Sequence, residues 1–402
     1  MEPSKCQKQK LFVGIALATL LMGMFLSCVT YAALNTSITV GSSGTIWTGQ
    51  ISQIRVIGNQ TVTASGTPII LKGMGYTYFV NNEKAYDGDW MMPDGSIVWD
   101  RWSTTGVQNT LDFMQASGSN VVRVFMTVQH WIENTDDFQN HIKYFVSEAA
   151  NRGIYTVLTF WNTEDGKSLP QTEPWNDGNN YITTSEDFVN VWGDVATSMK
   201  NYLSVIFELW NEPQGNEAVW FSAAQQCINR IRSAGADQPI MVQWSYQINY
   251  DWGSGWHYGM NWVFNNPLND PQNSIIYSTH IYSNSYSGFF NSHTGTTVTD
   301  YDSIEYALSE CKVYDVAAIY PVFIGEIGCS NWDSINQPIY FNNTLTALDQ
   351  HGIGYAVFAG PPWTSATEWG LVQSGAPNYT LNTAGTILVD HLGGTNYADW
   401  SS

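Results

Sequence analysis

Two glutamates far apart in the sequence are the residues best suited to chemistry in this chain. Glu212 lies in the sequence LWNEP (residues 209–213), and Glu326 lies in IGEIG (residues 324–328). Each follows a hydrophobic run that predicts a buried parallel strand. Two carboxyl groups held face to face can divide one task, because one keeps its proton as an acid while the other stays ionised as a nucleophile. Such a pair is suited to breaking a glycosidic bond.

Either string alone is a weak signal. Pro213 could simply end a strand or begin a helix, and a glutamate after a strand is often a helix cap or a solvated loop residue. The joint occurrence of two such glutamates, each at the end of a predicted strand, favours the catalytic interpretation.

Three further polar residues lie in or at the end of strand-like runs. Arg123 interrupts the apolar run 121–125, and a buried arginine is costly unless a carboxylate pairs with it. We expect Arg123 to keep Glu326 ionised, although a purely structural ion pair would satisfy the same need. His280 and Tyr282 end another run, and alternation points both rings to the same side. We therefore expect both rings to hydrogen-bond to the glutamates.

The elements that must position these residues alternate along the chain. Strand-like runs cover residues 69–71, 121–125, 155–160, 203–209, 240–244, 275–281, 320–324 and 354–358. Helical spacing is found in residues 107–114, 138–146, 186–200, 217–234, 302–313 and 338–351. Strands that alternate with helices predict parallel pairing, and eight such units predict a closed (β/α)8 TIM barrel in the α/β class. The two glutamates then follow the fourth and seventh strands, at the face where barrel enzymes place their active sites.

One large domain is predicted, preceded by a targeting segment and a short extension. Residues 1–33 combine basic residues with an uncharged stretch at 11–29, which is typical of a signal peptide or an uncleaved membrane anchor. In both cases the rest of the chain is exported, either secreted or tethered to the outer face of the membrane through residues 11–29 alone. Residues 34–68 are predicted to form an extension with a short β-hairpin, and residues 69–402 the catalytic barrel.

The composition favours a carbohydrate partner and argues against nucleic acid. The net charge is −20, so a phosphate backbone would be repelled. Aromatic residues make up 14% of the chain against 12% charged residues, and exposed rings stack on the C–H faces of sugars. Trp363, after the eighth predicted strand, is the candidate platform for a sugar. Further candidates for substrate binding are Trp90, Trp161, Trp175, Trp244, Trp252 and Trp256.

No motif indicates a cofactor or a metal. The sequence has no His-Glu-x-x-His, no Walker loop, no Gly-x-Ser-x-Gly elbow and no Cys-x-x-Cys. Outside the targeting segment the cysteines are Cys227, Cys311 and Cys329, and a Cys311–Cys329 disulfide stays open. We expect a monomer without cofactor or metal.

With these motifs in this order, the chain resembles glycoside hydrolase family 5, whose (β/α)8 barrels carry catalytic glutamates on strands four and seven. The resemblance spans roughly residues 69–369 and implies an endo-acting, retaining hydrolase of β-1,4-linked polysaccharide. It implies that Glu212 is the acid/base, that Glu326 is the nucleophile and that Asn211 holds the 2-hydroxyl of the sugar. The arginine, histidine and tyrosine named above would tune and orient the pair.

The end of the third predicted strand departs from the family pattern. Many family cellulases carry a histidine there, where this chain has Trp161 followed by Asn162. We expect cellulose or β-glucan as substrate. Because mannan-cleaving relatives often have an asparagine-containing motif at this point, Asn162 keeps an endo-β-1,4-mannanase as the alternative. A non-catalytic carbohydrate-binding barrel would keep the tryptophans without needing both glutamates, and transglycosylation differs from hydrolysis only in water access.

A retaining mechanism requires two carboxyl groups about 5–5.5 Å apart and of different acidity. We expect the negative charge of Glu326 to raise the pKa of Glu212, and Arg123 with Tyr282 to keep Glu326 ionised. The predicted activity is bell-shaped in pH, with an alkaline limb that reflects loss of the Glu212 proton.

Overall fold

The computed structural model describes residues 38–40, 44–46, 51–77, 104–134, 137–162, 181–182, 184–213, 217–243, 259–283, 290–291, 296–330, 334–361, 369–374 and 379–395. The chain divides into two units, residues 1–50 and residues 51–402. In the first unit, β1 (Ile38–Val40) pairs antiparallel with β2 (Gly44–Ile46). The second unit contains all the other described elements.

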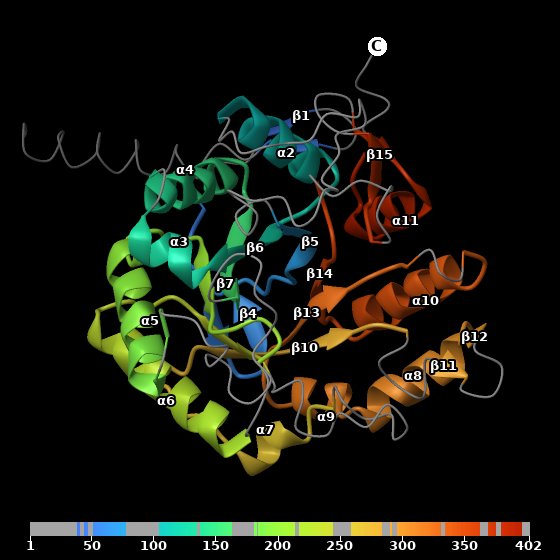
Figure 1. Ribbon diagram of the computed structural model, residues 1–402. Helices are drawn as coiled ribbons and strands as arrows, with labels where there is room; N and C mark the ends of the chain where they lie inside the picture. Colours follow the sequence, from blue (N-terminus) through green and yellow to red (C-terminus); the bar gives the residue numbers. More distant parts are fainter. Residues whose placement is uncertain are drawn as a thin grey trace, which may run out of the picture. The chain divides into compact units, whose positions relative to one another are not determined.

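Eight parallel strands close into a barrel, with helices around it (Figure 1). In chain order the strands are β5 (Lys72–Tyr76), β6 (Val121–Thr127), β7 (Tyr155–Asn162), β8 (Val205–Glu208), β9 (Ile240–Gln243), β10 (Ile275–Ile281), β13 (Val322–Ile327) and β14 (Gly354–Val357). Each strand pairs with the next, and β14 closes onto β5. The predicted (β/α)8 barrel is confirmed.

The helices form the outer ring. They are α2 (Thr104–Ala116), α3 (Val128–Glu133), α4 (Phe138–Asn151), α5 (Ser185–Met199), α6 (Glu217–Ser233), α7 (Trp262–Asn265), α8 (Tyr301–Glu310), α9 (Val313–Ala317), α10 (Gln337–Gln350) and α11 (Thr383–Leu392). All six predicted helical segments are helical, but residues 302–313 are interrupted at Lys312, whose backbone is left-handed with φ 63°. Two short antiparallel pairs were not predicted: β11 (Phe290–Asn291) with β12 (Thr296–Thr297), and β15 (Val372–Ser374) with β16 (Thr380–Leu381).

The first barrel strand lies later in the sequence than expected. The prediction placed it at residues 69–71, whereas the strand is β5, with the sequence KGMGY. Because this strand contains two glycines, it does not appear as an apolar run in the sequence. The packing of the barrel requires at least the first of these glycines, Gly73. A Cβ at Gly73 would lie 1.8 Å from the carbonyl oxygen of Val121 on β6. Residues 69–71 lead into the strand, and the side-chain amide of Asn120 hydrogen-bonds to this segment on either side of Leu71.

The inward faces of the strands change character along the barrel. One apolar cluster draws on every strand or the residue before it and therefore fills the interior: Leu71, Val121, Tyr155, Val157, Ile206, Met241, Ile276, Phe323 and Ala356. Strand alternation also points inward the residues two positions after Val121, Val157, Ile206, Met241 and Ile276. These are buried and polar: Arg123, Thr159, Glu208, Gln243 and Ser278. The interior is therefore apolar at the N-terminal end of the strands and polar at the C-terminal end.

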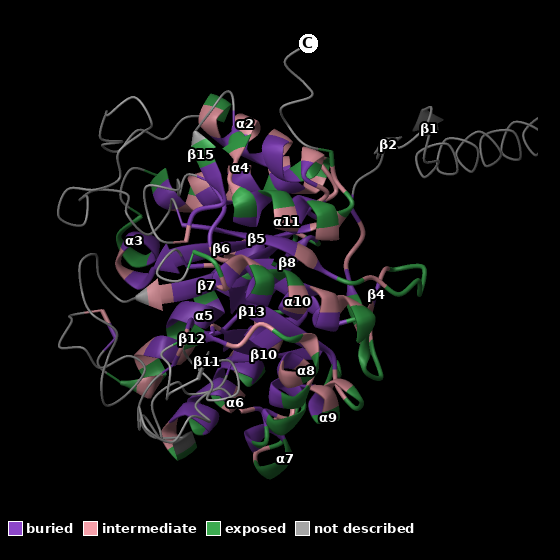
Figure 2. Ribbon diagram, turned by 90° about the vertical axis from the view of Figure 1, so that its right-hand side faces the viewer, coloured by how far each residue is buried: buried purple, intermediate pink, exposed green. Residues whose placement is uncertain are grey.

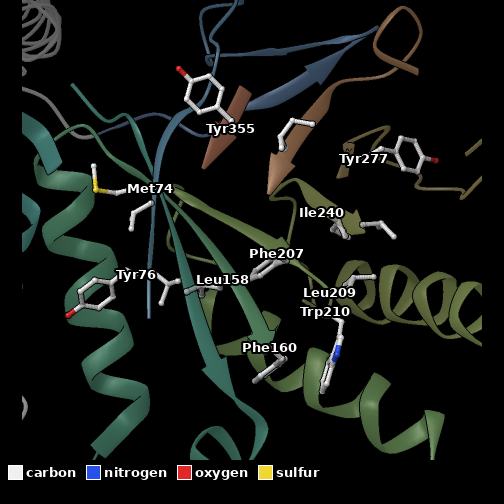
Figure 3. Close-up of a cluster of buried hydrophobic side chains, with 14 of the residues drawn as sticks. Met74, Tyr76, Leu158, Phe160, Phe207, Leu209, Trp210, Ile240, Tyr277 and Tyr355 are labelled. Carbon is white, nitrogen blue, oxygen red and sulfur yellow. The ribbon is translucent and has the colours of Figure 1, made fainter. Parts of the chain in front are cut away.

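The outward faces of the strands pack against the helices in a second, larger cluster (Figure 3). Phe207 of β8 is fully buried and meets the ring of Trp192 on α5 edge-on, with centroids 5.9 Å apart. The indole nitrogen of Trp192 donates to the carbonyl oxygen of Leu209 at 2.9 Å. The barrel strands are accordingly mostly buried, while most exposed residues lie on helices, on turns and on the short strands outside the barrel (Figure 2).

The N-terminal end of the barrel is closed by residues that precede a hairpin. The hairpin, β3 (Arg55–Ile57) with β4 (Gln60–Val62), lies within the predicted extension. Just before it, Ile51 and Ile54 are buried in the interior cluster. The hydroxyl of Tyr155 donates to the carbonyl oxygen of Ser52 at 2.8 Å. These contacts form a floor beneath the apolar half of the barrel.

Two further expectations from the sequence concern a disulfide bond and a membrane-spanning segment. Cys311 and Cys329 are both free thiols, so they do not form the disulfide that the sequence left open. Among the residues that the structure describes, no helix combines the length and hydrophobicity needed to span a membrane. The stretch at 11–29 lies outside the described residues.

Replacing Phe207 with Ala should strongly destabilise the barrel, because it opens a cavity between β8 and α5. We expect the free energy of unfolding to fall by about 3–5 kcal/mol. Urea unfolding followed by tryptophan fluorescence measures this. Phe264→Ala is the matched control, since this ring on α7 is 44% exposed and its loss should cost no more than about 0.5 kcal/mol. Equal losses at the two positions would contradict this description of the core.

Candidate active site

Arg123 lies at the centre of the polar end of the barrel. It is fully buried, and each of its three guanidinium nitrogens donates to a different side chain. Nε bonds to Glu208 at 2.5 Å, Nη1 to Glu326 at 2.8 Å and Nη2 to Asn211 at 2.8 Å. Burial by itself lowers the pKa of Arg123, but attraction and hydrogen bonds from the two carboxylates outweigh burial and raise the pKa above its ordinary value. The guanidinium therefore stays charged.

Glu326 accepts a hydrogen bond on each carboxylate oxygen. Oε1 accepts from Arg123, and Oε2 accepts from the hydroxyl of Tyr282 at 2.6 Å. Both donors stabilise a negative charge on this carboxylate. The structure therefore brings Arg123 and Tyr282 to Glu326, as expected from the sequence.

A bulge in β13 aims Glu326 into the barrel. The prediction placed Glu326 just after the seventh strand, but it lies within β13, and regular alternation from the inward Phe323 would point it outward. The pairing skips Gly325: Ile324 is opposite Thr279 and Glu326 is already opposite the next residue of β10. The extra residue re-aims the side chain that follows it. Glycine is needed at 325, because a Cβ there would lie 2.9 Å from both Nε2 of His280 and Oγ of Ser278.

Glu212 lies beyond the end of β8, in a turn that both neighbouring strands hold. Its backbone is left-handed, with φ 47°, a conformation that costs a non-glycine residue about 1–2 kcal/mol. Its N–H donates to Oε1 of Gln243 on β9 at 2.9 Å, and the N–H of Asn211 donates to the carbonyl oxygen of Phe160 on β7 at 2.8 Å. The carboxylate Oε1 is 2.8 Å from Nδ1 of His280.

The pKa of Glu212 is raised from 4.5 to about 7 because the carboxyl group is buried, while the charge of Arg123 opposes the rise. Its side chain is only 15% exposed. The direction agrees with the sequence-based expectation, but the cause does not. We expected the negative charge of Glu326 to raise this pKa, whereas removal from water does so. At neutral pH a substantial fraction of Glu212 therefore carries a proton.

His280 is a neutral ring at neutral pH. Burial lowers its pKa to about 4, and although the charges of Glu326 and Glu208 oppose this, they do not overcome it. Its Nδ1 lies 2.8 Å from Glu212 and 3.5 Å from Glu326. His280 therefore links the two carboxyl groups without adding a positive charge to the site.

The two carboxyl groups and the imidazole lie close together. One oxygen of Glu212, one oxygen of Glu326 and one ring nitrogen of His280 are all within 4.8 Å of one another. Among the described residues, this is the single group of histidine, cysteine or acidic side chains compact enough to share a cation. Its oxygens are already engaged by Tyr282, by His280 and by the guanidinium of Arg123, which supplies the positive charge. A site without metal stays our prediction.

Aromatic rings continue the site away from the carboxylates. The guanidinium of Arg123 lies over the ring of Phe125, 4.6 Å from its centroid, and Phe125 meets Trp161 edge-on at 6.1 Å. Trp161 is only partly buried at the end of β7. On the other side, Tyr282 meets Trp369 edge-on at 5.0 Å. Trp161 is therefore placed at the edge of the polar end of the barrel, as a residue that binds substrate must be.

Some predicted substrate-binding residues lie outside the described residues. These are Trp90, Trp175, Trp244, Trp252, Trp256 and Trp363. Asn162 ends β7, but its side chain also lies outside the description.

Two residues that the sequence argument missed hold the site together. Glu208 is fully buried and pairs with Arg123, and Gln243 fixes the backbone of Glu212. The signal for Glu208 was available: it is a charge inside an apolar strand, the same anomaly that drew attention to Arg123. Gln243 gave no comparable signal, because a neutral amide at a strand end is common.

A family model matches the part of the sequence that carries this site. The model described as cellulase (glycosyl hydrolase family 5) matches residues 63–361, which contain both glutamates together with Arg123, His280 and Tyr282. The chain belongs to glycosyl hydrolase family 5. It is therefore a glycoside hydrolase of the cellulase type, on a barrel fold that supports this chemistry.

Curated relatives of this family 5 chain include both glucan- and mannan-directed enzymes. An endoglucanase of Neurospora crassa is 27% identical over 217 residues, which is 50% of this chain and 49% of that protein. A mannan endo-1,4-β-mannosidase of Cellvibrio japonicus is 22% identical over 345 residues, 83% of this chain and 70% of that protein. The match thus spans about half the length of the Neurospora relative.

Solved structures of family members share the fold. A β-glucanase from Saccharophagus degradans, solved with cellotetraose, aligns with a TM-score of 0.61 at 18% identity and covers 85% of this chain and 93% of that one. The catalytic domain of an endoglucanase from Thermobifida fusca aligns with a TM-score of 0.58 at 18% identity, and the alignment covers 85% of this chain and 97% of that one.

The activity of this family 5 hydrolase should fall above pH 7, because Glu212, whose pKa is about 7, then loses the proton that an acid must donate. We expect kcat/KM to decline by about tenfold per pH unit on that limb. Initial rates measured from pH 4 to 10 test this. A limb that begins two or more units higher would remove Glu212 from the acid role.

The raised pKa of Glu212 should also make the folding stability depend on pH, with stability decreasing as pH rises. Because the pKa is higher in the folded state, the Glu212 contribution is fully present below about pH 4.5 and is lost as pH rises to about 7, by up to about 3 kcal/mol. Glu212→Gln does not titrate, so this variant should match the wild-type protein at pH 4 and exceed its stability at pH 8. Parallel stability curves for the two proteins would contradict the raised pKa.

Proposed function

We propose that this chain is an endo-acting, retaining hydrolase of β-1,4-linked glucan, either cellulose or a related β-glucan. The observation that carries the proposal is the pair of carboxyl groups, which bring one oxygen each to within 4.8 Å and whose surroundings differ. Inverting enzymes separate their carboxyl groups by about 6.5–9.5 Å to admit a water between them. The shorter separation favours direct attack by one carboxylate.

In the first step, Glu326 attacks the anomeric carbon while Glu212 protonates the departing glycosidic oxygen. The carbon–oxygen bond to the leaving sugar breaks as the bond to Glu326 forms, so the intermediate is a covalent glycosyl ester. Glu326 suits this role because Arg123 and Tyr282 each donate to one of its oxygens and hold the carboxylate in place. Glu212 suits the acid role because burial keeps its proton available near neutral pH.

In the second step, Glu212 works as a base. The carboxylate left after the first step removes a proton from water, the water oxygen bonds to the anomeric carbon, and the ester bond to Glu326 breaks. The anomeric configuration is inverted twice and therefore retained. Asn211, fixed by Arg123, would hold the 2-hydroxyl of the sugar bound at the point of cleavage.

The relatives favour glucan as substrate, with mannan second. The Neurospora relative is named an endoglucanase, and the structure from Saccharophagus holds cellotetraose. The Cellvibrio relative, which aligns over more of this chain, is named a mannosidase. Glucose and mannose units differ in configuration at C2, so the surroundings of the 2-hydroxyl decide between them. Asn162 at the end of β7 is the feature of this chain that supports the second candidate.

Export from the cytoplasm is part of the proposal. A polysaccharide chain is too large to enter a cell, and the basic residues followed by an uncharged stretch at 11–29 fit a signal peptide or an anchor. The protein would then act outside the cell, either free or tethered through this segment.

Replacing Glu326 with Ala should lower turnover at least about a thousandfold, because no nucleophile remains. Added azide should restore cleavage of an aryl cellobioside and yield a glycosyl azide of inverted configuration, identified by NMR. Glu148→Ala removes a carboxylate that pairs with Arg152 and accepts a hydrogen bond from Asn151 at the C-terminal end of α4, and it should keep wild-type activity. Normal hydrolysis by the Glu326 variant without azide would overturn the assignment.

Reducing-sugar release should separate the two substrate classes. We expect the wild-type protein to release sugar from carboxymethylcellulose, barley β-glucan and lichenan, with galactomannan the poorest of the four. All four should be assayed at equal mass concentration, with viscosity loss as the measure of internal cleavage. Release from galactomannan alone would replace the glucanase assignment with mannanase.

A further inference from the structure

Glu208 is a buried carboxylate that the two hydrolytic steps do not use. It lies on β8, four residues before Glu212, and its side chain is 0% exposed. Oε2 accepts from Nε of Arg123 at 2.5 Å. Oε1 is buried and has no hydrogen-bond partner within the described part of the chain. Glu208 therefore makes one strong contact, and that contact is to the residue that holds Glu326 and Asn211.

The geometry of this contact fixes the direction of the other two. A guanidinium group is planar, with its donors in a rigid fork. Holding Nε against Glu208 on one strand leaves Nη1 and Nη2 directed at Glu326 and Asn211, each at 2.8 Å. Without the anchor, the fork could turn about the bonds of the arginine side chain, and both of these groups would lose their position.

The balance of charge around Arg123 also gives Glu208 a role. Arg123 contributes one positive charge and Glu326 one negative charge, and these two alone would cancel. With Glu208 the group is net negative, so the nucleophile is oriented by a cation whose charge is already balanced. Among the described residues, the charged and titratable groups around Glu212 and Glu326 are Arg123 from β6, Glu208 from β8, His280 from β10, Tyr282 just after β10, and Glu326 itself from β13. The intervening β7 and β9 present the uncharged Thr159 and Gln243.

We propose that Glu208 is a positioning residue that acts through Arg123: it fixes the plane of the guanidinium and balances its charge, so that Glu326 stays a strong nucleophile and Glu212 retains its proton. The inference rests on the proposed roles of the two glutamates. It assigns to Glu208 a function in the reaction, beyond that of a partner in a structural ion pair.

Two variants separate the two parts of this role. Glu208→Gln keeps the shape and one oxygen acceptor for Nε but removes the charge. Glu208→Asp keeps the charge but shortens the side chain, so the anchor is lost. Asp270→Asn is the matched control, because Asp270 is equally buried and paired with Arg232 at 2.7 Å. That pair joins the C-terminal end of α6 to the segment before β10, at the opposite end of the barrel.

The decisive measurement needs no substrate. Carbon-13 NMR of glutamate carboxyl groups, with the Glu212 signal assigned from Glu212→Gln, gives the titration midpoint in each variant. In Glu208→Gln we expect the midpoint of Glu212 to fall by about one pH unit, because the charge of Arg123, which lowers the pKa of Glu212, is then no longer offset by Glu208. The alkaline limb of kcat/KM should move by the same amount. In Glu208→Asp the midpoint should stay within a few tenths of a unit, while kcat falls about tenfold and KM changes little.

Asp270→Asn should lower the Tm yet leave the midpoint, the pH profile and kcat unchanged. If Glu208→Gln behaved in the same way, Glu208 would be structural only and the proposal would be wrong. Should Glu208→Gln fail to fold, Glu208→Asp decides alone, and a wild-type kcat would overturn the role. If the wild-type protein cleaved no glucan while the midpoint still moved, the substrate proposal would fail and the role of Glu208 would stand.

Discussion

The buried positive charge of Arg123 is the constraint on which the rest of this site depends. Removing one partner from a buried ion pair typically costs about 3–5 kcal/mol, so the fold must deliver compensating groups to each nitrogen. It does so from β8, from the turn after β8 and from the bulge of β13. The positions of the nucleophile and of the sugar-binding amide are therefore consequences of neutralising one guanidinium inside a barrel.

Two carboxyl groups a few ångströms apart have surroundings that differ in kind. Glu326 receives two donors, whereas Glu212 faces a neutral imidazole and has lost most of its water. Burial raises the pKa of Glu212, and the charge of Arg123 opposes this rise. The same burial makes the folded protein less stable near neutral pH, so catalytic readiness and stability oppose each other at this residue.

The barrel was predictable because its strands are buried and therefore appear in the sequence as apolar runs, which alternate with segments of helical spacing. The glycine-rich β5 was not recognised as a strand, because its glycines allow a close approach of the backbones and contribute no apolar side chain. Arg123 and its need for a carboxylate could be inferred, yet its second partner, Glu208, was missed although the same reasoning applied to it. The bulge at Gly325 could not be inferred, because pairing register depends on the neighbouring strands. Substrate choice depends on side chains beyond the strand ends, which follow no period.

The floor of the barrel ties the beginning of the catalytic unit to its end. Ile51 and Ile54 share one interior cluster with Phe323 of β13 and Ala356 of β14. During synthesis the floor leaves the ribosome first, but the cavity that it must fill is enclosed only after the last strand has been made. Until then these isoleucines have no complete binding site within the chain, and contacts of such long sequence separation form slowly. A nascent chain of this protein therefore carries exposed apolar surface until almost its whole length has been translated.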